Sequence, residues 1–157
     1  MAGANIDDID MQILAELQDD GRMTNVDLAR KVGLTAPPCL RRVRALEEYG
    51  AIRSYHADID PATLGFTITV FAMVSLKSQA EADLKAFEDH MAGLPEVREC
   101  HMLNGEIDFI LKVVARDLQS FQQFLTSKLT PAPNVASVKT SLTIRTAKNL
   151  PGVPLRA

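Results

Sequence analysis

The chain has 157 residues, of which 46% are hydrophobic, and a formal net charge of −3 from 17 Lys and Arg against 20 Asp and Glu. This composition supports one ordinary or two small folded domains, and no apolar run reaches the length of about 18 residues that a membrane span needs. The acidic start, MAGANIDDIDMQ, is unlike an export signal, so we expect a cytoplasmic protein. Cys39 and Cys100 lie in no CxxC or Cys/His cluster, which favours buried thiols over a disulfide or a zinc site.

Residues 7–20 are predicted to form a first helix. Asp7 can cap its start, and Gly21 can end it. The apolar side chains recur with helical spacing and should face a core; they are Ile9, Ile13, Leu14 and Leu17.

Residues 24–49 predict two short helices joined by a tight turn. Thr24 can cap the first helix, with Asp27 three residues further on, and Gly33 can end it with a positive φ. Thr35 can cap the second helix. This arrangement is typical of a helix-turn-helix, which places its second helix in a DNA groove.

The second of these helices separates its residues by face. Cys39, Val43 and Leu46 have the spacing of a buried stripe, whereas the arginines project from the rest of the surface. Guanidinium groups suit guanine and phosphate, although an ordinary solvated helix face is the alternative interpretation. The residues that we predict to contact DNA are Thr35, Pro37, Pro38, Arg41, Arg42 and Arg44.

The charge is unevenly distributed along the chain. Residues 21–55 contain seven basic and three acidic side chains, a local charge of +4, whereas residues 1–20 contain six acids and no base. Positive charge is therefore concentrated on the predicted DNA-binding segment, where it would release counterions from DNA.

A connector separates this segment from the rest of the chain. Residues 52–59 have an extended character, and Pro61 and Gly65 close the segment, so a short β-wing or linker would complete a winged helix-turn-helix. The domains that we predict are a DNA-binding domain at 1–51, a β linker at 52–65, and an oligomerisation and ligand-binding domain at 66–157.

The pattern of residues 66–147 predicts the order strand, helix, strand, strand, helix, strand. This is the βαββαβ order of a ferredoxin-like α+β sandwich, with two helices on one face of an antiparallel sheet. The predicted strands are 66–76, 97–103, 108–115 and 135–146, and the predicted helices are 80–92 and 117–129. The side chains expected in the core include Leu84, Phe87, Met91, Phe109, Leu111, Val113, Leu118, Phe121, Leu125, Leu129, Val138, Leu142 and Ile144.

The other face of this sheet is predicted to be apolar and uncovered. Phe71, Met73, Ile110 and Val114 can lie on it, which is more apolar surface than a monomer usually exposes. Pairing with the sheet of a second copy would cover this surface and give a two-fold dimer. Scattered surface hydrophobic residues are the alternative.

With both halves described, the chain resembles the Lrp/AsnC family of bacterial and archaeal transcriptional regulators. The resemblance covers nearly the whole chain, and its markers are NVDLARKVGL, CLRRVRALEEYGAI, DPATLGF, PEVRECHMLNGEIDFIL and the late VKTS. It implies a winged helix-turn-helix on double-stranded DNA and a ferredoxin-like effector domain. The two-fold dimer predicted above would place two such helix-turn-helix units on a roughly palindromic site. The resemblance also implies dimers that assemble further, often to octamers, and a free amino acid bound between dimers as the effector, with no other cofactor.

The resemblance also implies an effector site. Its centre in the family is a Gly-x-x-Asp loop, which Gly105-Glu106-Ile107-Asp108 matches here, and Asp108 could accept an ammonium group. Without the resemblance, Asp108 would be interpreted as a turn residue that ends a hairpin. The full set of effector candidates is Asn104, Gly105, Glu106, Ile107, Asp108, Ser141, Leu142 and Thr143, with Met102, Leu118 and Thr130 in addition.

The chain departs from the family pattern at two places. It has Ala132-Pro133-Asn134-Val135 where members often have Leu-Pro-Gly-Val, and an asparagine can also take the left-handed conformation. Ser141 and Thr143 are small and polar where the leucine-responsive member has larger apolar residues, which leaves room for a different amino acid.

Two other functions are compatible with parts of the sequence. An amino-acid sensor without DNA binding would not need the arginines of the second helix. A small ferredoxin-like enzyme could use His101 with Asp108 or Glu99, but a nucleophile, a metal cluster and a phosphate loop are missing around them. The sequence therefore favours a DNA-binding regulator that is not an enzyme.

Overall fold

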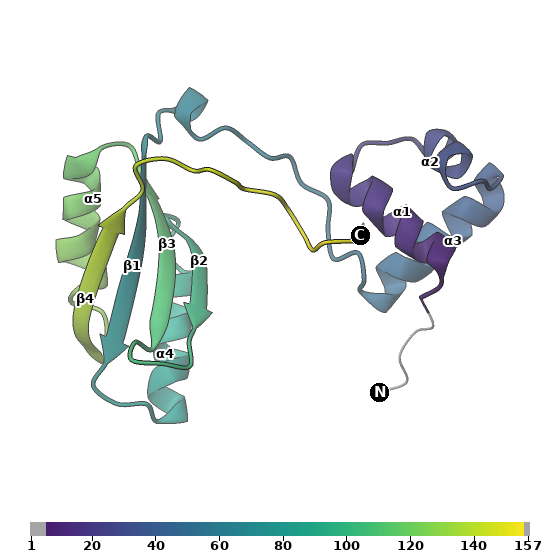
Figure 1. Ribbon diagram of the computed structural model, residues 1–157. Coiled ribbons are helices and arrows are strands. Elements are labelled where there is room, and N and C mark those ends of the chain that lie inside the picture. Colours follow the sequence, from purple (N-terminus) through teal and green to yellow (C-terminus); the bar gives the residue numbers. More distant parts are fainter. Residues whose placement is uncertain (1–5, 156–157) are drawn as a thin grey trace. The chain divides into compact units, whose positions relative to one another are not determined.

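The computed structural model describes residues 6–155. The chain forms two compact units (Figure 1). Unit 1 contains residues up to 58 together with the segment from residue 148 onward, and unit 2 contains residues 59–147. Within residues 6–155, no helix is both long and apolar enough to cross a membrane. Each unit has its own buried core.

Unit 1 begins with helix α1 (Asp8–Asp19), whose start is fixed by a reciprocal cap. The backbone N–H of Asp10 donates to the Asp7 carboxylate at 2.9 Å, and the N–H of Asp7 donates to Asp10 at 3.3 Å. The predicted cap is thus confirmed. The end differs from the prediction, because the C-cap is Asp20 and Gly21 lies in the following turn.

Helices α2 (Asn25–Lys31) and α3 (Ala36–Tyr49) form the predicted helix-turn-helix. Gly33 has a φ of 70°. With this conformation, the N–H of Gly33 donates to the carbonyl of Arg30, and the N–H of Leu34 donates to that of Ala29. These two bonds are a Schellman motif, which ends α2 and directs the chain into α3.

The core of unit 1 joins the three helices. The predicted stripes of α1 and α3 are confirmed, since Ile13, Cys39 and Leu46 are buried and Val43 packs against them. The fully buried members from α2 are Leu28 and Ala29. Each large apolar side chain buried in this way contributes roughly 1.5–3 kcal/mol to stability.

The segment between the units contains no strand. Residues 53–60, where we expected a β-wing or a linker, have no strand hydrogen bonds, and the 3-10 turn Ala62–Leu64 follows them. Gly65, with a φ of 79°, then leads the chain into the sheet of unit 2.

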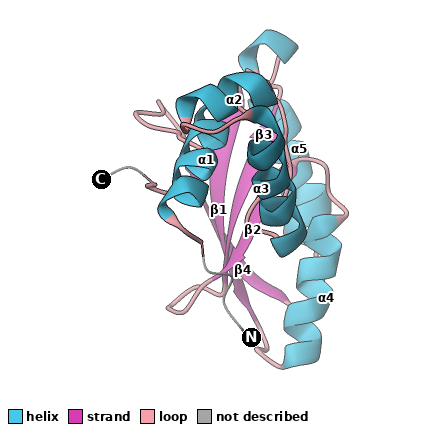
Figure 2. Cartoon of the chain, turned by 90° about the vertical axis from the view of Figure 1, so that its right-hand side faces the viewer, coloured by secondary structure: helices cyan, strands magenta, loops and turns pink. Residues whose placement is uncertain are grey.

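Unit 2 has the predicted ferredoxin-like order. Its sheet is antiparallel, with the strand order β2-β3-β1-β4, and both long helices lie on one face (Figures 1 and 2). The elements are β1 (Ile68–Leu76), α4 (Glu81–Ala92), β2 (Val97–Met102), β3 (Phe109–Ala115), α5 (Leu118–Phe124) and β4 (Val135–Leu142). A π-helical turn, Leu125–Leu129, extends α5.

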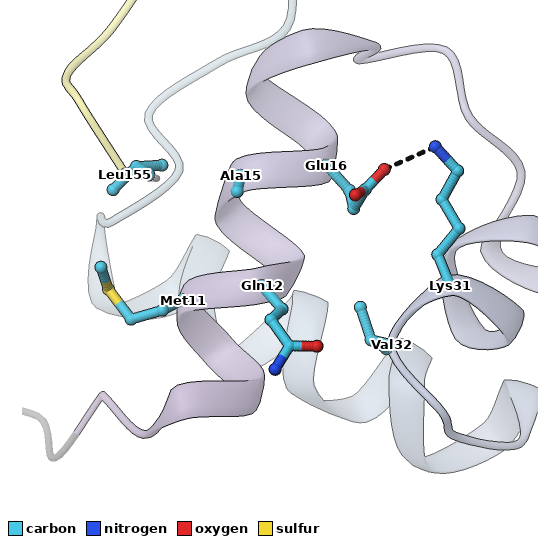
Figure 3. A pocket seen from close by; sticks show the side chains of 7 residues that line it. All are labelled: Met11, Gln12, Ala15, Glu16, Lys31, Val32 and Leu155. Carbon is cyan, nitrogen blue, oxygen red and sulfur yellow. Dashed lines mark hydrogen bonds and ion pairs between the residues drawn. The ribbon is translucent and has the colours of Figure 1, made fainter. Parts of the chain in front are cut away.

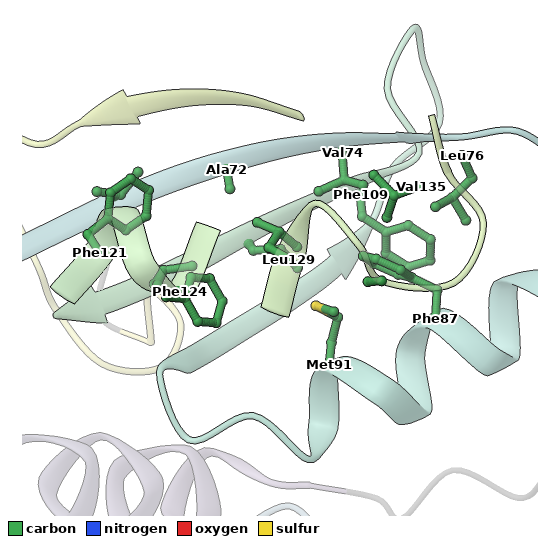
Figure 4. Close-up of a cluster of buried hydrophobic side chains, with 14 of the residues drawn as sticks. Ala72, Val74, Leu76, Phe87, Met91, Phe109, Phe121, Phe124, Leu129 and Val135 are labelled. Atoms are coloured by element: carbon green, nitrogen blue, oxygen red, sulfur yellow. The ribbon is translucent and has the colours of Figure 1, made fainter. Parts of the chain in front are cut away.

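The core of unit 2 lies between the sheet and these helices (Figure 4). Alternate residues of β1 and β3 enter it, and the ring centroids of Phe87 and Phe109 are 4.8 Å apart. Leu118 was expected in this core but is 62% exposed, whereas Phe124 is buried. The reason is that Phe121 and Phe124 define the buried face of α5, and Leu118 lies beside that face in the first turn.

Strand β4 is shorter than predicted. Its last bond to β1 is donated by the N–H of Thr143 to the carbonyl of Thr69. Because β1 begins at Ile68, the chain beyond Thr143 has no strand to pair with. Ile144, expected in the core, is 96% exposed, and Leu142 is exposed as well.

The turn before β4 keeps its left-handed residue. Asn134 has a φ of 66°, as the sequence predicted. Its side-chain amide donates to the Ser78 carbonyl at 2.7 Å, and its side-chain oxygen accepts the Ser78 N–H at 3.1 Å. Glycine could form the turn but not these two bonds, so asparagine also connects the start of β4 to the end of β1.

The C-terminal segment 148–155, called here the tail, packs within unit 1, although we expected it in the domain that begins at residue 66. The Gln18 amide donates to the Val153 carbonyl at 2.8 Å and accepts the Val153 N–H at 3.0 Å. Gly152 has a φ of 69°, and a Cβ at this position would lie 1.9 Å from the Gln18 side-chain oxygen. Gln18 thus forms a paired amide contact with the tail that requires glycine beside it.

Candidate DNA-binding face and effector loop

Helix α3 presents an exposed stripe opposite its buried face. Pro37, Leu40, Arg41 and Arg44 recur at i, i+3, i+4 and i+7, and all four are exposed. Among the described residues, Arg41 and Arg44 form no ion pair. Their guanidinium groups are therefore available to a partner, as expected for DNA contacts.

Arg42 has a different position from the one we expected. Its guanidinium lies 2.8 Å from the carboxylates of both Asp7 and Asp10, and 32% of its side chain is exposed. The bond from the Asp10 backbone and the nearby Arg42 hold the pKa of Asp7 below its ordinary value. Arg42 thus connects α3 to the cap of α1, while Arg41 and Arg44 remain on the open stripe.

The two basic residues of α2 are also paired. Arg30 pairs with Asp27 at 2.9 Å, and Lys31 pairs with Glu16 at 2.5 Å. These pairs neutralise positive charge within unit 1. The positive charge that faces outward on α3 is consequently that of Arg41 and Arg44.

The first turn of α3 has few hydrogen-bond donors. Thr35 occupies the N-cap position, as predicted, but its side chain makes no cap hydrogen bond. Pro37 and Pro38 lack a backbone N–H, so Ala36 has the only amide donor among the first three helical positions. Leu40, which we did not predict as a functional residue, is 38% exposed beside this turn. Its i−4 spacing from Arg44 could have identified it.

Asp108 has structural partners within unit 2. The N–H of Leu76 donates to its carboxylate at 2.6 Å, and the Gln79 side-chain amide lies 3.4 Å away. Its own N–H donates to the Val74 carbonyl, and its carbonyl accepts from Leu103. The carboxylate therefore accepts the Leu76 N–H at the point where the pairing of β1 with β4 shifts register. Gln79 is 29 residues away in sequence, and no local pattern indicated this contact.

The effector candidates fall at two ends of the sheet. The loop 104–108 contacts the end of β1 at Val74 and Leu76, whereas Ser141 pairs with Phe71 and Thr143 bonds to Thr69. A strand rises about 3.3 Å per residue, so the positions on β1 that the two groups contact lie roughly 10–23 Å apart in one chain. Met102 and Thr130 belong to the loop end, and Leu118 and Leu142 belong to the other. One chain does not bring these residues together.

The sheet face opposite the helices is uncovered in the single chain. Phe71 on this face is exposed, and Met73, Ile110 and Val114 are half-buried. A polar cluster lies beside them: Lys112 contacts Glu99 at 2.9 Å, and His101 lies 3.4 Å from the same carboxylate. The Lys112 ammonium keeps the pKa of Glu99 below its ordinary value. His101 is thus beside Glu99, while Asp108, the other acid proposed for an enzyme, is bonded to Leu76.

A pocket of about 130 Å³ lies on unit 1, between α1, α2 and the tail (Figure 3). Met11, Ala15, Val32 and Leu155 form its apolar wall, and the Lys31–Glu16 pair closes one side. The effector candidates contribute no residue to it. It is part of the contact between the tail and α1.

The two cysteines lie in different units of the chain. Cys39 and Cys100 are free, and burial raises the pKa of Cys39 and raises that of Cys100 to about 11. Within residues 6–155, no cluster of three or more His, Cys, Asp and Glu side chains could hold a metal ion. Cys39 is buried as predicted, whereas Cys100 is half-buried.

Comparison with known proteins agrees with this architecture. The family model described as "Winged helix-turn-helix DNA-binding" matches residues 6–53. The model described as "Lrp/AsnC ligand binding domain" matches residues 69–153, which is more than half of the chain. The chain belongs to the Lrp/AsnC family of transcriptional regulators.

Named relatives and a solved structure support this assignment. The chain is 55% identical to the leucine-responsive regulatory protein of Rhizobium meliloti (strain 1021), over 92% of each chain. It is 41% identical to the Bkd operon transcriptional regulator of Pseudomonas aeruginosa, over 97% of this chain and 99% of that one. A transcriptional regulator of Neisseria meningitidis, solved in complex with L-Met, superposes with a TM-score of 0.90 at 33% identity, covering 95% and 96% of the two chains.

Proposed function

We propose that this regulator binds a roughly palindromic site on double-stranded DNA through α3 of two protomers. We further propose that a free amino acid, bound by unit 2, controls this binding or the assembly of dimers into an octamer. The protein would meet both partners in the cytoplasm, where free thiols such as Cys39 also stay reduced. No catalytic role is proposed, since the relatives named above are transcriptional regulators.

The DNA-binding proposal rests on one observation: Arg41 and Arg44 are exposed and form no ion pair with the part of the chain that the structure describes. The other basic side chains of α2 and α3, those of Arg30, Lys31 and Arg42, have acidic partners. Two guanidinium groups that are unpaired within residues 6–155, one turn apart on the second helix of a helix-turn-helix, match the donors that major-groove recognition requires. A sensor without DNA binding would have no use for them.

Single-arginine variants test this proposal. Arg41→Ala and Arg44→Ala should each weaken binding to the duplex upstream of the regulator's own gene by about 1–3 kcal/mol if the residue reads a base. Arg98→Ala, which removes an exposed arginine from unit 2, is the matched control. Fluorescence anisotropy at several salt concentrations separates a base contact from a phosphate contact, because the latter lowers the salt slope by about one. Unchanged affinity in both variants would contradict the proposal.

The effector proposal rests on the loop 104–108 and on the family assignment. Asp108 supplies a carboxylate beside a glycine loop, which suits the ammonium group of an amino acid. Because Ser141 and Thr143 lie at the other end of the same sheet, we propose that the complete site takes its loop and its late strand from different protomers. The L-Met complex of the Neisseria meningitidis regulator shows an amino acid bound by a similar protein.

Two substitutions at Asp108 separate charge from structure. Asp108→Asn keeps an oxygen that can accept the Leu76 N–H but loses the negative charge, whereas Asp108→Ala loses both. Calorimetry with the twenty amino acids should show that both variants lose the affinity of the parent protein, while both still bind DNA without effector. Parental affinity in Asp108→Asn would mean that Asp108 serves only the turn.

A further inference from the structure

The exposed stripe of α3 combines two chemistries. Arg41 and Arg44 supply charge, whereas Pro37 and Leu40 supply apolar surface on the same stripe. Leu40 is 38% exposed although α3 has a buried stripe that an apolar residue could occupy. Successive side chains of a helix are rotated by about 100°, so Leu40 is turned by about 100° from the buried Cys39 and away from that core.

The first turn of α3 offers DNA few backbone hydrogen-bond donors. Recognition helices place their N-terminal residues against base edges, and backbone amides there often bind phosphate. Pro37 and Pro38 remove two of these amides. This turn instead presents apolar side-chain surface, from Pro37 and Leu40. The apolar feature of a base pair in the major groove is the C5-methyl group of thymine.

We propose that Leu40 is a specificity-determining residue that reads the C5-methyl group of a thymine in the major groove. This inference rests on the proposed DNA-binding function and adds a base identity to it. Arg44 lies four residues further along the helix, a rise of about 6 Å, which spans roughly two base pairs. A base contacted by Arg44 would therefore lie within about two base pairs of the thymine read by Leu40.

The test uses the intact protein and duplexes that contain deoxyuridine. Uracil keeps every hydrogen-bonding group of thymine and lacks only the methyl group. A duplex is first selected from a random library with the intact protein. Each thymine is then replaced by deoxyuridine in turn, and affinity is measured for the parent, for Leu40→Ala and for Leu40→Met. Val26→Ala is the matched control, because Val26 is an exposed apolar residue on α2.

In the parent protein, one thymine in each half-site should lose about fourfold affinity on conversion to uracil, the value of one buried methyl group. Leu40→Ala should bind the parent duplex more weakly and show no further loss with uracil. Leu40→Met and Val26→Ala should keep the uracil effect. Circular dichroism checks that each variant is folded. If Leu40→Ala is not folded, Leu40→Gln replaces it, because it keeps the length of the side chain but removes its apolar end and should likewise lose the uracil effect.

Two outcomes would overturn the inference while DNA binding itself persists. One is a uracil series without any loss in the parent protein. The other is a loss of the same size in Leu40→Ala, which would assign the methyl group to a different residue. Failure to select any duplex would instead count against the proposed DNA-binding function.

Discussion

The two units of this regulator differ in how much of their proposed function one chain contains. In unit 1, the stripe of α3 is complete: its arginines are exposed, and α1 and α2 hold the helix from behind. In unit 2, the effector candidates lie at two ends of the sheet, and an apolar sheet face is uncovered. Under the proposed function, each chain would contact DNA by itself, whereas the amino acid would be bound only by an assembly.

The largest effect is expected when assembly is prevented. Replacing both Phe71 and Met73 with arginine places charge on the uncovered sheet face, and burying an unpaired guanidinium costs several kcal/mol. We expect the double variant to be a monomer of 17.2 kDa by light scattering, with its response to amino acids lost.

The matched control for this variant is Gln122→Arg, on the exposed side of α5. It adds a charge to unit 2 without touching the uncovered face, so it should keep the parental mass. A parent protein that is itself monomeric at micromolar concentration would disprove the proposed sheet pairing.

A second prediction concerns the contact between the tail and Gln18 in unit 1. Gly152→Ala forces an L side chain into a left-handed conformation and into the Gln18 amide, which should detach the tail. We expect unit 1 to lose about 1–2 kcal/mol of stability, with faster hydrogen exchange in α1. Gly105→Ala is the control, because a Cβ there meets no atom within 4 Å. Equal thermal midpoints for parent and Gly152→Ala would show that the tail does not stabilise unit 1.

The smallest effect is expected at Arg42. Arg42→Ala removes partly exposed ion pairs to Asp7 and Asp10, so the thermal midpoint should fall by about 1–2 °C. The pKa of Asp7 is lowered in the folded protein. The ionised carboxylate therefore stabilises the fold at pH values above its ordinary pKa of 3.8, and this stabilisation disappears as the pH falls through the lower pKa of the folded state. The difference in thermal midpoint between parent and variant should therefore be largest near neutral pH and disappear in acid. Arg44→Ala, on the open stripe, should show no such difference.

The sequence predicted features that depend on neighbours within one or two turns. The Asp7 cap, the glycine that ends α2, the Cys39/Leu46 stripe and the left-handed Asn134 all follow from local patterns. The periodicity of apolar residues and the residue types found in turns determine such features, whatever the rest of the fold is.

Features that depend on distant partners were not predictable in this way. Arg42 was grouped with the DNA contacts because helical spacing places it between two faces, and its acidic partners lie 32 and 35 residues away. Gln18 and Val153 are 135 residues apart, so no local pattern could connect them. The separation of the loop 104–108 from Ser141 follows from strand register, which the sequence motifs do not specify.

The tail contact has a consequence for how the molecule is made. Unit 1 contains residues from both before and after unit 2, so the chain must pass through the whole of unit 2 before the tail can reach Gln18. Domains usually fold as they leave the ribosome, with the N-terminal one first. Here the DNA-binding unit starts first but acquires its full set of contacts last, after the sensing unit has been synthesised.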